Sequence, residues 1–168
     1  YIDPNASAVG EQVYKLINEL NVEIDKDIAV CLYVSILTDT GSFSYANTTD
    51  KTHLIIAKLM EYGIDASKIN NQVYENNSIG KLKLLSKVLN FISLSEDGKV
   101  SWIILTDDML KETNTDASEA DGFVNYPRTI SGVEVSILFR EANAGKIRVS
   151  LRSNGKVNVN EIASKFDG

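Results

Sequence analysis

Apolar residues recur every three or four positions over much of residues 9–93, which is the period of an amphipathic α-helix. The pattern predicts helices that each follow a residue type common at helix N-termini: Ser7, Asp25, Thr48 or Thr49, Asp65 or Ser67, and Ser78. The second of them, through Ile28 and Ile36, is apolar over much of its circumference. We therefore expect that helix to be central in its unit.

The pattern changes after Gly98. A run of β-branched and large apolar residues at Val100–Leu105 predicts a strand, and Thr106 can begin a short helix. Alternating apolar and polar residues predict a hairpin of 133–140 and 147–152 around Asn143-Ala144-Gly145, and a last helix over 159–166 behind Asn158. The expected fold class is α/β, with a helical first part, a mixed second part and a boundary near 93–98.

Charge and cysteine usage restrict the classes of function. Seventeen basic and twenty-three acidic residues give a net charge of −6, which argues against a broad platform for duplex DNA but not against a small phosphate pocket. The single cysteine, Cys31, lies in an apolar run, so we expect a buried thiol and no disulfide framework. No apolar run is long enough to span a bilayer and no signal peptide is visible, so we expect a cytoplasmic protein.

Asp39 is the first candidate for chemistry. It stands in Thr38-Asp39-Thr40-Gly41, directly after the apolar helix. One interpretation is a plain turn, because Asp and Thr side chains bond nearby backbone N–H groups. The other is a metal ligand, held rigidly at the end of a core segment. The only histidine, His53, is more typical of a polar residue on a helix surface.

The second candidate is Arg152-Ser153-Asn154-Gly155, between the predicted hairpin and the last helix. A guanidinium, a hydroxyl and an amide near a helix N-terminus suit a phosphate or carboxylate. The alternative is a strand-end arginine beside a turn, with Glu141 paired to Arg148 or Arg152. Trp102 and Phe123 are expected in the core.

Four segments together resemble the DHH/DHHA1 phosphoesterases: YIDPNASAVGEQVYKLI, LYVSILTDTGSFSYANTTDKT, GVEVSILFRE and KIRVSLRSNGKVNVNEIASKF. The resemblance covers nearly the whole chain. It is strongest to the RecJ-like branch of bacterial nano-RNases that cleave short oligoribonucleotides and dephosphorylate 3′-phosphoadenosine 5′-phosphate.

The resemblance implies roles for a few residues. Asp39 matches a metal-binding motif of the DHH domain, whose carboxylate helps to hold two Mn²⁺ ions and so serves catalysis. Arg152, Ser153 and Asn154 match the DHHA1 segment that contacts the phosphate and nucleotide of the substrate.

The implied organisation is the C-terminal part of a DHH domain at 1–76, a connector helix at 77–97, and a DHHA1 substrate-binding domain at 98–168. The other metal motifs of the family would precede Tyr1, and a glycine-rich segment with a histidine would follow Gly168. We therefore expect a piece of a longer enzyme, catalytically incomplete by itself.

The expected activity of the whole enzyme is Mn²⁺-dependent hydrolysis of short single-stranded RNA or of 3′-phosphoadenosine 5′-phosphate. A homodimer is compatible with the sequence. Two alternatives stay open, namely hydrolysis of linear or cyclic dinucleotides by the same family, and a non-catalytic module that binds nucleotides or a partner.

Overall fold

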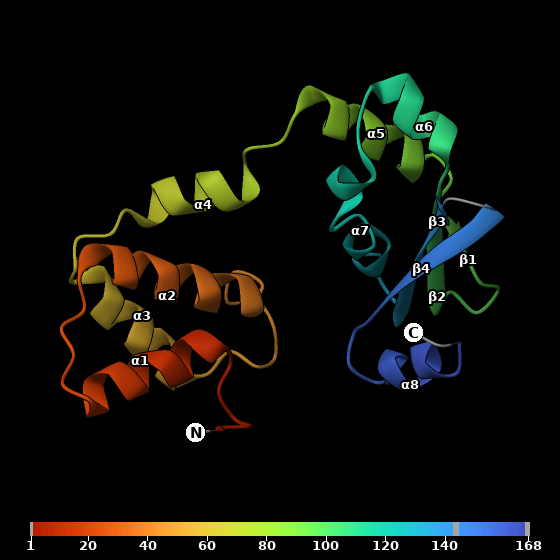
Figure 1. The fold of residues 1–168 in the computed structure, drawn as a ribbon. Coiled ribbons are helices and arrows are strands. Elements are labelled where there is room, and N and C mark those ends of the chain that lie inside the picture. The colour runs from red at the N-terminus through yellow and green to blue at the C-terminus, as the bar shows by residue number, and fades with distance from the viewer. Residues whose placement is uncertain (1, 143–144, 167–168) are drawn as a thin grey trace. The chain divides into compact units, whose positions relative to one another are not determined.

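The computed structural model describes residues 2–142 and 145–166, which form two compact units, Tyr1–Asn76 and Asn77–Gly168 (Figure 1). The first unit contains helices, and the second combines helices with a sheet. This confirms the α/β class predicted from the two hydrophobic periods. Among the described residues, no helix has both the length and the apolar character that crossing a membrane requires.

The helices of the first unit are α1 (Val9–Glu19), α2 (Lys26–Asp39), α3 (Asp50–Met60) and α4 (Ala66–Tyr74). Helix α2 packs against both α1 and α3. Its Ala29 and Ile36 have no exposed surface, and Leu59 of α3 joins them in one core cluster. The prediction that the apolar second helix is central is therefore confirmed.

Two expectations for this unit are wrong. Cys31 is exposed, not buried, because it lies on the side of α2 away from its buried neighbours Leu32 and Tyr33. Ser7 does not cap α1, since Ala8 is the N-cap residue and no side chain caps it. Asp25, Thr49 and Asp65 do accept the expected N–H groups at the starts of α2, α3 and α4, and Thr49 forms a full capping box with Thr52.

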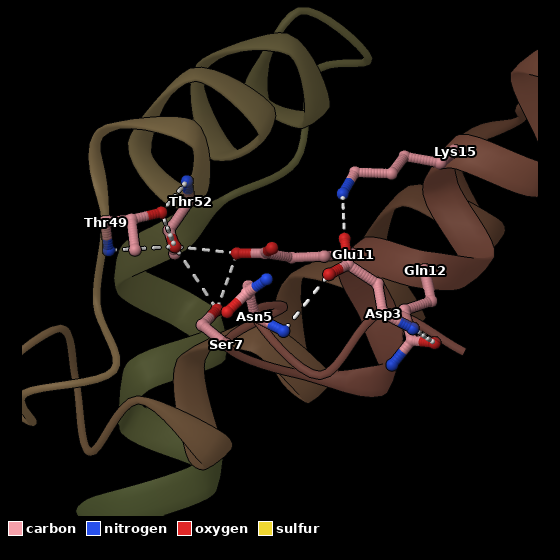
Figure 2. Close-up of polar contacts among 8 residues, drawn as sticks. All are labelled: Asp3, Asn5, Ser7, Glu11, Gln12, Lys15, Thr49 and Thr52. Atoms are coloured by element: carbon pink, nitrogen blue, oxygen red, sulfur yellow. Dashed lines mark hydrogen bonds and ion pairs between the residues drawn. The ribbon is translucent and has the colours of Figure 1, made fainter.

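Ser7 instead joins a buried polar cluster between α1 and α3 (Figure 2). The Ser7 hydroxyl donates to Glu11 Oε1 at 2.5 Å, and the Thr52 hydroxyl donates to the same oxygen at 2.6 Å. Thr49 closes the cluster by donating its N–H to Thr52 Oγ1 at 3.1 Å. A buried carboxylate is costly without partners, so these bonds tie the start of α3 to α1.

The second unit is built on a four-stranded sheet with the order β1-β2-β3-β4. The strands are β1 (Ser93–Leu94), β2 (Val100–Leu105), β3 (Val135–Ala142) and β4 (Lys146–Ser153). Strands β2 and β3 are parallel, and their connection carries α6 (Asp107–Thr113), the 3-10 helix η1 (Ala117–Ala120) and α7 (Asn125–Arg128). Strands β3 and β4 form the predicted antiparallel hairpin, shifted by up to two residues from its expected bounds. Its predicted turn residues Asn143 and Ala144 lie outside the described residues.

One face of the sheet is covered by the helices. Ile103 and Leu105 of β2 and Leu138 of β3 pack with residues of α5 (Ile79–Leu89), α6 and the segment before α7. Phe123 is 1% exposed there, as predicted. Trp102 was expected in the core but is only half-buried, because strand alternation places it on the other face from Ile103.

Helix α5 belongs to the core of the second unit. Its Leu84 and Val88 have no exposed surface and lie in the cluster with Ile103 and Leu105. This helix falls within the segment 77–97 that the resemblance describes as a connector. The last helix, α8 (Val159–Ser164), contacts β4 and is capped by Asn158 as predicted.

Candidate functional site

Asp39 is the last residue of α2, and the turn that follows it is left-handed. Gly41, Ser42 and Phe43 have φ angles of 54°, 56° and 65°. This conformation is unfavourable for Ser and Phe. A Cβ atom on Gly41 would lie 2.4 Å from the ring of Tyr45, so glycine is required unless that ring moves.

Thr40 holds this turn in place. Its buried hydroxyl donates to the Ile36 carbonyl at 2.6 Å and accepts the Phe43 N–H at 3.1 Å. The Thr40 carbonyl accepts the N–H groups of Ser44 and Tyr45, both at 3.0 Å. The backbone next to Asp39 is therefore fixed by a buried side chain.

Asn47 fixes Asp39 from a second direction. Its side-chain amide donates to the Asp39 carbonyl at 3.1 Å and to the Ser7 carbonyl at 2.9 Å. Asp39 itself is exposed, and within residues 2–142 and 145–166 its carboxylate makes no hydrogen bond or ion pair. A rigid backbone with an open carboxylate suits a ligand-binding oxygen.

The donor set around Asp39 does not complete a metal centre within the described part of the chain. There, no group of three or more His, Cys, Asp or Glu side chains is arranged to hold a metal ion. His53, which is exposed, places its ring 5.5 Å from that of Phe43, as expected of a surface residue. Asp39 thus offers one hard oxygen donor, whereas a divalent ion takes about six ligands.

A second candidate site is a groove of about 380 Å³ in the second unit. One wall is the segment 117–124, and the other is the face of β3 and β4 that carries Arg140, Arg148 and Arg152. Strand alternation and pairing explain this grouping. Arg148, Ser150 and Arg152 point to one face of β4, and Arg140 is the direct partner of Arg148 across the ladder.

The groove carries positive charge in an acidic chain. Its lining includes three arginines and one carboxylate, Asp121, and none of the ion pairs among the described residues joins them. Arg140 donates to the Ala117 carbonyl at 3.0 Å and Arg152 to the Leu151 carbonyl at 2.9 Å. Each guanidinium keeps further N–H groups for a ligand, because Arg has five. Planar N–H pairs of this kind bind phosphate oxygens in a bidentate manner.

Ser153 and Asn154 lie beside Arg152 in sequence but do not line the groove. The Ser153 hydroxyl donates to Glu134 Oε1 at 2.9 Å, and the Asn154 amide donates to the Val133 carbonyl at 2.8 Å. Burial alone would raise the pKa of Glu134, but N–H groups of Lys156 and Val157 and the Ser153 hydroxyl outweigh it and lower that pKa. Both predicted residues therefore hold the end of β4.

Glu141 does not pair with either predicted arginine. Its carboxylate accepts the N–H of Asp107 at 2.8 Å, at the start of α6, and no ion pair between described residues joins it to Arg148 or Arg152. Strand alternation explains this, because Glu141 points to the opposite face from Arg140. At the start of α8, the backbone N–H groups of Asn160 and Glu161 donate to the Asn158 side chain, so these two N–H groups are not available to a ligand.

Sequence reasoning identified Arg152 but missed Arg140 and Arg148. The alternation Arg148-x-Ser150-x-Arg152 was a usable signal for a shared face. Arg140 was harder to find, because its neighbourhood depends on the register of the hairpin. Nothing in the local sequence pattern predicts that residues 117–124 form a wall of the groove.

Comparison with known proteins matches residues 85–168 to the family model described as "DHHA1 domain". The bifunctional oligoribonuclease and PAP phosphatase NrnA of Bacillus subtilis is 34% identical over 171 residues, covering 100% of this chain and 53% of that protein. The protein of the same name from Thermus thermophilus is 31% identical, covering 99% of this chain and 49% of its own length.

A crystal structure of an exopolyphosphatase-related protein from Bacteroides fragilis superposes with a TM-score of 0.91 at 33% identity, over 97% of this chain and 48% of that one. The chain therefore spans about half the length of the curated relatives that it matches.

Proposed function

Because the chain belongs to the DHHA1 domain family, we propose that it is part of a phosphoesterase that hydrolyses short oligoribonucleotides, 3′-phosphoadenosine 5′-phosphate, or both. The relatives from Bacillus subtilis and Thermus thermophilus carry both activities in their names. Their similarity extends over the whole of this chain, including the turn after Asp39 and the strand that carries Arg152.

The observation that carries the proposal is the arginine groove. Three guanidinium groups gather in one groove of a protein with a net charge of −6, which suits a small phosphorylated ligand and not a long duplex. Its volume of about 380 Å³ is within the range of pockets that bind small molecules. In this proposal Arg152 orients a substrate phosphate by a two-point contact.

Ser153 and Asn154 support Arg152 in the proposed function. Their hydrogen bonds to Glu134 and the Val133 carbonyl hold the end of β4, so Arg152 keeps its place on the groove wall. The Ser153 hydroxyl hydrogen and both N–H groups of the Asn154 amide are engaged within the second unit, so donation from either side chain to a nucleotide would require these bonds to open. We therefore propose that Ser153 and Asn154 chiefly position Arg152, and that contact with the substrate is a secondary role.

We further propose that Asp39 is one ligand of a divalent metal, with Mn²⁺ favoured where carboxylate and imidazole ligands mix. A pair of such ions, when bound, lowers the pKa of a water molecule and stabilises charge on the phosphoryl group. Asp39 would contribute one oxygen from a rigid turn. The remaining ligands would have to come from outside the described residues.

A non-catalytic nucleotide-binding module is the second candidate. The small number of metal ligands favours this candidate, because the described residues offer only Asp39 as a candidate metal ligand. The arginine groove, by contrast, needs no metal ion to bind phosphate. The two proposals differ in turnover and not in binding.

Titration of the 168-residue chain with 3′-phosphoadenosine 5′-phosphate and a 5′-phosphorylated dinucleotide tests the groove. Arg152→Ala should weaken binding by roughly 1.5–3 kcal/mol, and Arg152→Lys should rescue it poorly because an ammonium group lacks the planar fork. Lys146→Ala is the matched control, since Lys146 lies on the same face of β4 but does not line the groove. Unchanged affinity in Arg152→Ala would reject the groove as the substrate site.

Chromatography of the same nucleotides after long incubation with Mn²⁺ separates the two candidates. This comparison uses the longer protein of which the chain is a part, because the described residues supply only one candidate metal ligand. Hydrolysis by that protein that Asp39→Asn abolishes would support the enzyme, and binding without hydrolysis by the same protein would favour the module. Including linear and cyclic dinucleotides tests the related substrates of the family. A cytoplasmic location and a homodimer are also part of the proposal, and cell fractionation and light scattering would test them.

A further inference from the structure

We infer that Asn154 is a site of spontaneous deamidation, and that the hydroxyl of Ser153 slows this reaction in the folded protein. Asn154 is followed by Gly155, and a glycine has no side chain to shield its backbone nitrogen from the asparagine side chain. Asn154 is also exposed, so water reaches its amide. The modification needs no enzyme and no reactant besides water.

The reaction converts the side-chain amide into a carboxylate in two steps. The backbone nitrogen of Gly155 forms a bond to Asn154 Cγ, the bond from Cγ to the amide nitrogen breaks, and ammonia leaves with the proton of the Gly155 N–H. Water then opens the cyclic imide that has formed. Opening at one carbonyl gives aspartate, and opening at the other gives isoaspartate, in which the backbone runs through the former side chain.

The folded structure opposes the first step at the attacking nitrogen. The Gly155 N–H donates to Ser153 Oγ at 2.9 Å, and the Ser153 hydroxyl donates to Glu134 Oε1, also at 2.9 Å. Because Glu134 holds the hydroxyl hydrogen, an oxygen lone pair of Ser153 stays turned toward Gly155. The nitrogen must lose its proton before it attacks, so this hydrogen bond has to be given up first.

The structure also opposes the first step at the carbon that is attacked. The Asn154 side-chain amide donates to the Val133 carbonyl at 2.8 Å and to the Arg128 carbonyl at 3.4 Å. The backbone N–H of Asn154 donates to the Glu134 carbonyl at 2.9 Å. Asn154 Cγ can join the Gly155 nitrogen only if the side chain leaves the two carbonyl groups that it contacts.

Deamidation would replace these favourable contacts by repulsion. An ionised carboxylate has no hydrogen to donate, so a carboxylate at position 154 would face the Val133 and Arg128 carbonyl oxygens without a bond to either. The end of β4 should then be less stable, and Arg152 should lose part of its support. The effect on ligand binding through Arg152 rests on the proposed function, whereas the deamidation and the loss of stability do not.

The test follows conversion of Asn154 by mass spectrometry of peptides from the 168-residue chain, incubated in mildly alkaline buffer. The folded chain should deamidate at least about tenfold more slowly than the same chain unfolded in urea, and Ser153→Ala should deamidate about tenfold faster than the unmodified folded chain, as the loss of one or two hydrogen bonds implies. Ser153→Thr keeps the hydroxyl and should restore the slow rate. Equal rates in Ser153→Ala and the unmodified chain, or in the folded and unfolded chain, would overturn the inference.

Native-state hydrogen exchange distinguishes this local effect from unfolding of the second unit. In Ser153→Ala, the Gly155 N–H should exchange faster while the amides of β3 keep their protection. If the amides of β3 lose protection to the same extent, the faster deamidation reflects unfolding and the role assigned to Ser153 is rejected.

Asn154→Asp reproduces one product of the reaction and tests its consequence. It should lower the urea midpoint of the second unit, measured by Trp102 fluorescence, and should weaken binding of 3′-phosphoadenosine 5′-phosphate severalfold. Asn160→Asp adds the same charge at another exposed position of this unit and should lower neither quantity. A midpoint for Asn154→Asp equal to that of Asn160→Asp would reject the consequence. If the unmodified chain binds no nucleotide, the proposed function fails, but the deamidation rates and the midpoints still decide this inference.

Discussion

Arg140 and Arg148 lie directly opposite each other in the antiparallel ladder of β3 and β4, with no carboxylate of the described residues paired to either. Like charges directly opposite each other on a sheet are destabilising. The relationship predicts an unusual response to mutation.

Removing Arg148 should not destabilise the second unit. Arg148→Ala should leave the free energy of unfolding unchanged or slightly raised, and Arg148→Glu should raise it by about 0.2–1 kcal/mol, because an opposite-charge pair replaces a like-charge pair. Trp102 is the only tryptophan and lies in β2, so its fluorescence in urea reports on this unit. A loss of more than about 1 kcal/mol in Arg148→Ala would show that Arg148 is structural.

The sequence was informative where local physics decides the structure. Residue type and position predict Asp25, Thr48 or Thr49, and Asp65 or Ser67 as N-caps, and in the structure Asp25, Thr49 and Asp65 each accept a backbone N–H. The hairpin is predicted by two alternating segments on either side of Asn143-Ala144-Gly145, because each strand carries its own period. These features depend on neighbours within a few residues.

Features that depend on distant parts of the chain were missed. The apolar run around Cys31 predicts a buried thiol, but Cys31 is exposed on α2, which packs against α1 and α3. The residue type and position of Ser7 predict a helix cap, whereas its actual role depends on Thr52 of α3, which only the fold brings to Glu11. Arg140 lies beside Arg148 because of the register of the β3–β4 hairpin, and that register cannot be read from the sequence.

Acid should destabilise the second unit through Glu134. Its pKa is lowered below the ordinary value of 4.5, so its stabilising effect is complete above about that pH and is lost as pH falls through the folded-state pKa. Glu134→Gln should reduce the free energy of unfolding at pH 7 and should differ less from the unmodified chain at about pH 3. Glu96→Gln, an exposed carboxylate near β1, is the control. A constant difference across this pH range would contradict the assignment.

The cluster of Ser7, Glu11 and Thr52 should be important for the stability of the first unit (Figure 2). Glu11→Ala removes the shared acceptor and leaves two hydroxyl groups without it, which should cost about 2–4 kcal/mol. Glu11→Gln keeps an acceptor oxygen but loses the charge, so about 1 kcal/mol is expected. Glu19→Ala, on the exposed end of the same helix, should cost less than about 0.5 kcal/mol.

Native-state hydrogen exchange of amides in α1 and α3 measures this effect separately from the second unit. If Glu11→Ala leaves the protection of both helices unchanged, the cluster does not hold them together.

The turn after Asp39 should require glycine at position 41 for two separable reasons. Gly41→Ala should cost about 1 kcal/mol for its positive φ and more for the contact with the Tyr45 ring. Gly63→Ala is the matched control, because Gly63 has a φ of 72° but no atom within 4 Å of the added Cβ. In a Tyr45→Ala background, the cost of Gly41→Ala should fall to that of Gly63→Ala. An unchanged cost in that background would mean that the ring contact contributes nothing.

The 168-residue chain should bind Mn²⁺ no more tightly than an ordinary acidic surface. Asp39 is held rigidly by Thr40 and Asn47, but a single carboxylate supplies one of about six ligands, and the described residues contain no cluster that adds the others. Calorimetry with Mn²⁺ should show only weak binding, and Asp39→Asn should not change it measurably. Asp50→Asn, another exposed carboxylate of this unit, is the control. Binding of one or two ions at micromolar concentration, abolished by Asp39→Asn and not by Asp50→Asn, would show that the chain assembles a complete site around Asp39.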